Sequence, residues 1–153
     1  MPRRPWPDRA LIGMVHLLPL PGAPRAVALE RTLARALADA RAWAAGGADA
    51  LLVENFGDRP FRPERVEPVT VAALARALAV IADAVRLPLG VNVLRNDARS
   101  ALALAAAFDL AFFRVNVHAG AALTDQGVLT GRADETLRER AALRCAARLF
   151  ADV

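Results

Sequence analysis

The sequence predicts an α/β fold of the (β/α)8 TIM-barrel type, and its 153 residues supply strands one to five of such a barrel. Four apolar runs each end in polar residues, at His16, Asp58, Asp97 and His118. The spacing is regular, because 38 residues separate His16 from Glu54 and Glu54 from Asn92. One strand and one helix fill such a step, and a barrel collects its functional side chains at the carboxyl ends of its strands. Eight such units need roughly 250 residues, so we expect about half a barrel here.

The strands are expected where apolar, β-branched runs precede these polar residues. They are predicted at residues 11–17, 49–55, 88–94, 110–117 and 147–153. In the fourth run, Phe113 and Val115 alternate with Arg114 and Asn116, so one face is apolar and the other polar. Strands of a flat, doubly wound sheet are instead apolar on both faces. The alternation therefore favours a barrel whose inner face becomes polar at the mouth, and no GxGxxG follows the first run.

Helices are predicted where apolar residues recur at three- and four-residue spacing, as at Leu29, Leu33 and Leu37. Their expected ranges are 27–45, 70–85, 98–107 and 134–144. Gly46 and Gly47 end the first helix, and Asp97 is placed to cap the third. We expect residues 119–131 to form a loop. Strands that alternate with helices predict a parallel sheet, with residues 1–10 as an extension and 11–153 as one partial barrel domain.

The composition is that of a globular protein, with 56% hydrophobic and 24% charged residues. Its net charge of +4 does not indicate nucleic-acid binding, because all 20 basic residues are arginines scattered among acidic residues. No apolar run is long enough for a membrane span, and no basic amphipathic helix predicts direct membrane attachment. The lone Cys145 is expected to be a buried thiol in a cytoplasmic protein.

The predicted catalytic residues are Glu54, His16 and His118, and the residues predicted to bind substrate are Asn92, Arg95, Asn96, Asp97, Arg114, Asn116, Asp58 and Asp125. Glu54 and Arg114 lie on alternate strands and are expected to meet across the lumen. Two interpretations remain open for this pair. It is either a structural ion pair, or a site in which Arg114, with Asn116 or Arg95, holds a small anionic metabolite beside a basic Glu54.

The other candidates carry alternatives of the same kind. His16 and His118 are suited to acid–base work, but a histidine at a strand end is also often structural. The histidines with Glu54 and Asp58 lack a recognised metal-ligand spacing, so no metal is predicted, and the sequence does not show which cofactor, if any, the protein uses. Asp58 suits a turn, Asn96 and Asp97 suit turn and cap positions, and the segment around Asp125 is either a lid or an ordered loop.

Four motifs carry a resemblance to a known family: IGMVHLLPLPG at 12–22, VENFGDRPF at 53–61, LGVNVLRND at 89–97 and FFRVNVHAGAALTDQGVLTGRA at 112–133. Through them the chain resembles the BtpA/SgcQ family from residue 11 to residue 153. The resemblance implies a TIM barrel and a connection with photosystem I biogenesis or sugar metabolism, without an established reaction. Many members are labelled phosphoribosylanthranilate isomerase-like. That enzyme has a cysteine base at its first strand end, where this chain has His16, so only a barrel relationship is expected.

Two classes of function follow from the sequence. The first is an enzyme for a sugar phosphate or similar anion, with proton abstraction next to a carbonyl as the expected chemistry. The second is a non-catalytic assembly factor. The polar inner-face residues favour the first class, because a purely structural barrel fills its lumen with aliphatic side chains. Open edges at the first and fifth strands predict either a fragment of a longer barrel or two copies that complete one another as a homo-oligomer.

Overall fold

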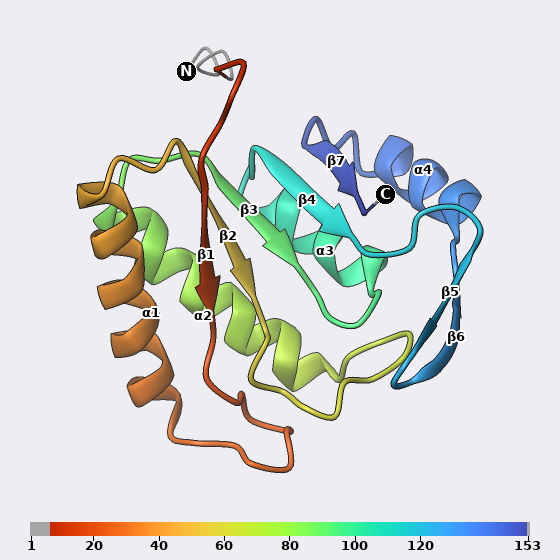
Figure 1. Cartoon of the computed structure of the whole chain (residues 1–153), viewed down its shortest axis with the longest axis horizontal. Coiled ribbons are helices and arrows are strands. Elements are labelled where there is room, and N and C mark those ends of the chain that lie inside the picture. Colours follow the sequence, from red (N-terminus) through yellow and green to blue (C-terminus); the bar gives the residue numbers. More distant parts are fainter. Residues whose placement is uncertain (1–6, 153) are drawn as a thin grey trace.

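The computed structural model describes residues 7–152 and confirms an α/β fold with a parallel sheet. The strand order is β1-β2-β3-β4-β7, and neighbouring strands pair in parallel (Figure 1). The strands are β1 (Ile12–His16), β2 (Ala50–Glu54), β3 (Leu89–Asn92), β4 (Phe112–Val115) and β7 (Arg148–Ala151). The helices between them are α1 (Leu29–Ala45), α2 (Pro68–Ala84), α3 (Ala98–Ala107) and α4 (Ala133–Ala142).

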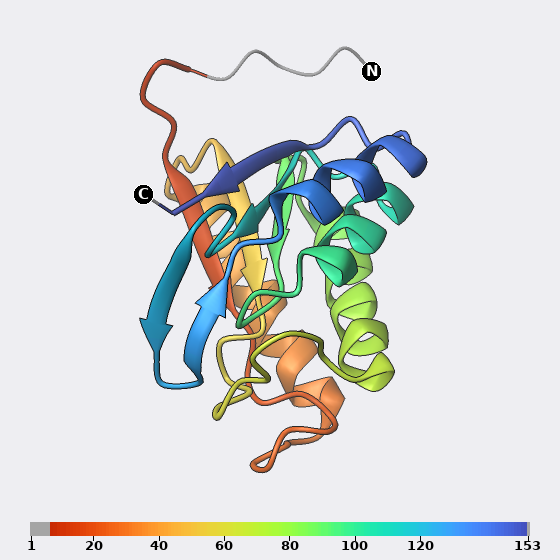
Figure 2. The same ribbon diagram turned by 90° about the vertical axis from the view of Figure 1, so that its right-hand side faces the viewer.

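The helices lie on one side of the sheet, as the view along its edge shows (Figure 2). Alternate strand residues point toward them, including Val53, Val91 and Phe113, each of which is fully buried. Leu74 and Leu78 of α2 complete this core from the helical side. Each such side chain stabilises the fold by roughly 1.5–3 kcal/mol relative to an exposed position. This layer holds the strands in register, so it also sets where their carboxyl ends lie.

The opposite face of the sheet carries a smaller apolar cluster. Leu52 and Phe112 are buried at its centre, and Met14 and Phe150 pack against them, with the Phe112 and Phe150 rings 4.9 Å apart. Polar residues take over on this face at the carboxyl ends of the strands, where Glu54 follows Leu52 by two residues and lies on the same face. The apolar and polar faces predicted from the alternation are therefore present in the sheet.

All five strands of the parallel sheet are shorter than predicted, and beyond the ends of β3 and β4 asparagine side chains take over the hydrogen bonds. β3 stops at Asn92, and the Asn55 side chain then accepts a hydrogen bond from the Leu94 N–H at 2.7 Å. β4 stops at Val115, and the Asn96 side chain bonds both the N–H and the carbonyl of Val117. The backbone groups of these two loops are satisfied without a longer strand.

The segment predicted as a loop at residues 119–131 instead contains an antiparallel hairpin. Its strands are β5 (Ala121–Thr124) and β6 (Gly127–Thr130), which form a separate two-stranded sheet. Gly127 has φ +92°, a conformation that favours glycine, and it follows the turn residues Asp125 and Gln126. The prediction missed the short apolar segments on either side of this turn. The hairpin extends from the end of the sheet where the parallel strands terminate (Figures 1 and 2).

The helix cap and the buried cysteine that the sequence predicts are both present in the fold. Asp97 caps α3, because its carboxylate accepts a hydrogen bond from the Ser100 N–H at 2.9 Å. Cys145 is buried, as expected. Residues 1–6 of the predicted N-terminal extension lie outside the described residues. Val153, the predicted end of the fifth strand, lies outside them too. Across residues 7–152, no helix combines the length and the apolar character that a membrane crossing requires.

Candidate functional site

Glu54 lies at the centre of a polar cluster built from the ends of four neighbouring strands. Its side chain is 4% exposed, and its carboxylate accepts a hydrogen bond from Asn92 of β3 at 2.9 Å. Arg114 of β4 lies 3.5 Å away, and His16 Nε2 of β1 lies 3.8 Å away. A buried carboxylate is costly without such partners, so these contacts keep Glu54 in place. The predicted meeting of Glu54 and Arg114 is confirmed.

Asp152 joins this cluster from the chain that follows β7. It forms a two-pronged ion pair with Arg114, whose Nε and Nη2 lie 2.8 and 3.0 Å from the two carboxylate oxygens. Asn116 also donates a hydrogen bond to Asp152 at 2.9 Å. Such a pair fixes the orientation of the guanidinium as well as its charge. Arg114 is therefore committed to two carboxylates, Glu54 and Asp152.

The charges of this cluster shift the pKa of both partners. The hydrogen bonds with Asp152 raise the pKa of Arg114 above its ordinary value, against the opposing effect of burial. Burial acts to raise the pKa of Asp152, but the hydrogen bonds from Arg114 and Asn116 and the positive charges of Arg114 and Arg95 outweigh it, so this pKa is lowered. Both groups are therefore charged at neutral pH. With Glu54, the cluster has two carboxylates and one guanidinium.

Asp58 and Asn55 belong to the loop after β2, and their side chains hold that loop to its neighbours. Asp58 accepts hydrogen bonds from the Leu20 N–H at 2.7 Å and from Asn55 at 3.1 Å. Burial raises the pKa of the Asp58 carboxyl, while these two hydrogen bonds lower it. The polar atoms of Asp58 are used in tying the loop after β1 to the loop after β2. This is the turn role that the sequence offered as an alternative for Asp58.

Asn96 and Asp97 hold the loop after β3 in the same way. Asp97 accepts hydrogen bonds from the Val66 N–H and from the Ser100 N–H and hydroxyl, and it is 3% exposed. Asn96 is occupied by the Val117 backbone. These two predicted substrate contacts are therefore engaged in cap and loop bonds.

Arg95 connects the loop after β3 to the tip of the β5–β6 hairpin. Its guanidinium donates hydrogen bonds to Asp125 and Gln126, each at 2.9 Å. The hydrogen bonds from Arg95 and Gln126 lower the pKa of the exposed Asp125 carboxyl. Arg95 also lies over the Phe61 ring, 5.0 Å from its centroid. The hairpin is thus fastened to the mouth of the sheet at its turn.

A stack of rings and guanidinium groups continues along the mouth from His16. The His16 ring stacks on Phe56 with 4.3 Å between centroids, and the Arg59 guanidinium lies 4.2 Å from the same Phe56 centroid. Arg59 also lies 5.9 Å from the Phe61 centroid, on which Arg95 is placed. Contacts of this type are attractive because the ring face is electron-rich. The stack links the ends of β1, β2 and β3 to the hairpin.

His118 follows β4, at the base of the hairpin. Its Nδ1 is buried and has no hydrogen-bond partner, and none of the contacts described for residues 7–152 joins it to Glu54. The structure therefore brings His16, but not His118, to the carboxylate that the sequence singled out. Within residues 7–152, no three His, Cys, Asp or Glu side chains lie together so that they could hold a metal ion.

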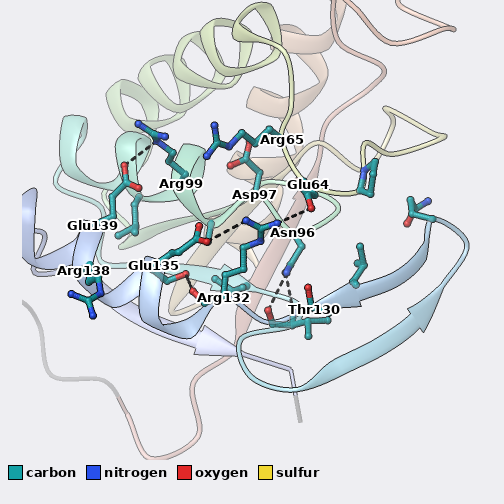
Figure 3. A pocket seen from close by; sticks show the side chains of 18 of the residues that line it. Glu64, Arg65, Asn96, Asp97, Arg99, Thr130, Arg132, Glu135, Arg138 and Glu139 are labelled. Carbon is teal, nitrogen blue, oxygen red and sulfur yellow. Dashed lines mark hydrogen bonds and ion pairs between the residues drawn. The ribbon is translucent and has the colours of Figure 1, made fainter.

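A cleft of about 770 Å³ lies between α3, α4, β6 and residues 63–65 (Figure 3). Glu54 does not line it, but Asn96, Asp97 and Gln126 do. Leu102, Val115 and Leu129 line it, and charged residues surround them. Arg132 pairs there with Glu64 at 2.8 Å and with Glu135 at 3.2 Å, and Arg99 pairs with Glu139 at 3.2 Å. These five charged residues are paired with one another, and Arg65 and Arg138 also line the cleft. We therefore place the candidate site at Glu54, where side chains from several strands converge on a buried carboxylate.

Sequence analysis missed several residues of this site, chiefly Asp152, Phe56, Arg59, Phe61 and Gln126. A signal existed for Asp152, because it ends an apolar run and follows Arg114 by the same 38 residues that separate His16 from Glu54. Phe56, Arg59 and Phe61 lie in an irregular loop, where no periodicity shows which side chains meet. Their contacts depend on how the loop folds over the mouth.

Comparison with known proteins gives consistent matches. The sequence model of the BtpA family matches residues 7–153. The chain is 46% identical to the photosystem I biogenesis protein BtpA of Synechocystis, over 94% of this chain and 50% of that protein. An uncharacterized protein of Archaeoglobus fulgidus is 44% identical, over 95% of this chain and 59% of that protein. The putative sgc region protein SgcQ of Escherichia coli is 34% identical, over 87% and 50%. The chain spans about half the length of these relatives.

Proposed function

The chain belongs to the BtpA family, and on that premise we propose that it binds a small anionic metabolite of the sugar-phosphate type at the carboxyl ends of its strands. The observation that carries the proposal is Glu54. A carboxylate that is 4% exposed, at the junction of four strands, is held by Asn92 and Arg114 and approached by His16. A buried carboxylate with an imidazole 3.8 Å away supplies two groups suited to proton transfer to and from a hydroxyl or a carbon next to a carbonyl.

We also propose that the chain is part of a (β/α)8 barrel. The five parallel strands are taken as the first five of a (β/α)8 barrel, with the helices outside and the polar cluster at the mouth. Helices on one side of the sheet and polar residues at the strand ends of the other side support this assignment. The reaction, substrate and partners proposed for this chain are those of a complete barrel, because the relatives are about twice as long as the chain. The proposal also includes a reducing cytoplasm, in which a single buried thiol such as Cys145 needs no partner.

A ligand panel on the 153-residue chain tests the proposal. We expect triose, tetrose and pentose phosphates to raise the melting temperature, and their unphosphorylated counterparts to have little effect. Saturation at about 100 times the dissociation constant stabilises a protein by about 2.7 kcal/mol, which gives a shift of several degrees.

Glu54→Gln is the matched variant, because it keeps the size of the side chain and removes its charge. We expect it to retain the phosphate-dependent shift and to abolish any turnover or solvent-proton exchange of the bound ligand. A panel without any shift on a folded chain would contradict metabolite binding. Exchange that persists in Glu54→Gln would exclude Glu54 as the base.

The second candidate is a non-catalytic assembly factor. The name of the Synechocystis relative, a photosystem I biogenesis protein, favours it. The same panel separates the two candidates, because an assembly factor without a ligand gives no shift with any compound. It would instead be recognised by co-purification with a protein complex from the source cell.

A further inference from the structure

The charge balance around Glu54 indicates where an anionic ligand can and cannot be held. Glu54 and Asp152 contribute two negative charges, and Arg114, which pairs with both, contributes one positive charge. Among these three side chains the carboxylates therefore outnumber the guanidinium by one. A phosphate placed against Arg114 has to compete with two carboxylates and is repelled by them at short range. The interior of the site is suited to hydroxyl and carbonyl groups, which the asparagines and carboxylates can hydrogen-bond.

The other predicted anchor, Arg95, is occupied as well. Its Nη2 pairs with Asp125 and its Nε donates to Gln126. Both arginines named from the sequence as anion anchors are thus engaged by acceptors of the protein itself. A ligand would have to displace those acceptors before either guanidinium could bind it in the two-pronged geometry that makes arginine effective.

Arg59 differs from both. Across residues 7–152 it has no carboxylate partner and its guanidinium donates no hydrogen bond. Its contacts are with the faces of Phe56 and Phe61. A guanidinium over a ring face uses none of its N–H groups as hydrogen-bond donors to a protein acceptor, so these donors stay available to a ligand. The loop after β2 therefore presents a positioned arginine with unused donors at the mouth.

The position of Arg59 also sets a length for the ligand. His16 and Arg59 lie 4.3 and 4.2 Å from the Phe56 centroid, and two groups that close to one ring cannot share a face. Phe56 therefore separates them, and His16 lies on the side that contacts Glu54. The Phe56 ring and the His16 ring therefore lie between the Glu54 carboxylate and an anionic group bound to Arg59. A ligand that reaches both needs several bonds between its anionic group and the part near Glu54.

We propose that Arg59, held on Phe56, binds the terminal phosphate of the metabolite, while the Glu54 cluster binds its uncharged, hydroxyl-bearing end. This inference rests on the proposed function and adds to it the residue that selects for the phosphate. In this assignment Arg114 orients the carboxylates of Glu54 and Asp152, and Arg95 holds the β5–β6 hairpin in place. The ligand class is a phosphomonoester of a polyol or sugar, in preference to a short carboxylate.

Calorimetric titration at low ionic strength tests this assignment with inorganic phosphate, glycerol 3-phosphate and glycerol as probes. We expect the wild-type chain to bind both phosphates and not glycerol. Arg59→Met should weaken phosphate binding by about 10- to 100-fold, the usual loss for a charge-assisted hydrogen-bonded contact. Arg59→Lys keeps the positive charge but lacks the forked N–H donors of arginine, so its phosphate affinity should lie between those of the wild type and Arg59→Met. Phe56→Leu should also weaken phosphate binding, because it removes the ring that positions Arg59.

Arg86→Met is the matched control, because it removes an exposed arginine just before β3, at the opposite end of the strands. We expect it to bind as the wild type does. Wild-type affinity in Arg59→Met, or a loss confined to Arg114→Met, would overturn the role of Arg59 and leave the proposed function standing. A wild-type chain that binds neither phosphate would contradict both proposals.

Discussion

At the scale of single residues, the polar side chains at the strand ends divide into two groups. Side chains of the first group form hydrogen bonds with the backbone of neighbouring loops, as Asn55 does with Leu94 and Asn96 with Val117. The other group, of which Glu54 and Asp152 are members, bonds only to side chains in the contacts described here. Residues of the first group build the loops at the strand ends, and residues of the second form the cluster around Glu54. The two groups are of similar residue types, so only their contacts distinguish them.

Asp152 should make stability depend on pH in a defined direction. Its pKa is lower in the fold than in the unfolded chain, so its contribution is complete above the unfolded value of about 3.9 and is lost as the pH falls through the folded value. Because its side chain is 40% exposed, the contribution is screened, and we expect no more than about 1 kcal/mol. Denaturant unfolding of the wild type and Asp152→Asn should differ by this amount at neutral pH and converge in acid. A difference that is unchanged in acid would argue against the ion pair as its source.

At the scale of elements, the loops after β1 and β2 approach each other more closely than most side chains allow. A Cβ on Gly57 would lie 2.5 Å from the Pro19 nitrogen and 2.7 Å from the Leu17 oxygen, both of them backbone atoms. The Gly57 N–H donates to that same Leu17 oxygen at 3.0 Å. This contact places Phe56, the residue before Gly57, against His16. A glycine here is therefore required by close packing of two loops that the site uses.

Gly57→Ala should push these loops apart. We expect a destabilisation of about 1–3 kcal/mol, because the obstructing atoms are backbone and cannot rotate away, and a weaker His16–Phe56 stack. Gly46→Ala is the milder comparison, since its Cβ would meet a backbone oxygen at 3.3 Å instead of 2.5–2.7 Å and φ is −77°, so we expect a smaller loss of stability. Thermal unfolding measures both variants. Equal melting temperatures for Gly57→Ala and the wild type would show that the loops do not depend on this contact.

At the scale of the whole molecule, the sheet has helices on one side only (Figure 2). The other side has a buried centre at Leu52 and Phe112, with Ile12 and Met14 only partly covered. Parallel sheets are normally covered on both faces. The strand order also places β1 and β7 at the two ends of the sheet. Both features favour association through the face that carries the site.

We therefore expect this chain to form a homo-oligomer at micromolar concentration. Sedimentation velocity should show a species of at least two chains, and Met14→Arg should convert it to single chains by placing a charge in the apolar face. Ala38→Arg, on the exposed side of α1, is the control and should leave the assembly intact. A wild-type chain that sediments as a single copy at high concentration would mean that this face needs no second chain.

The sequence by itself determined the parallel strands, the helices and the end of the sheet at which the candidate site lies, but not the β5–β6 hairpin. Periodicity of 2 and 3.6 residues is a property of the backbone, and it located the strands, the helices and the polar residues that follow the strands. The Glu54–Arg114 contact was also predictable, because alternate strands face the same interior. Tertiary structure decided the rest. A side-chain bond to a distant backbone group, such as that of Asn96 to Val117, leaves no periodic trace in the sequence. Neither does the stacking of Arg59 on Phe56, because both lie in a loop whose path depends on its packing against the rest of the molecule.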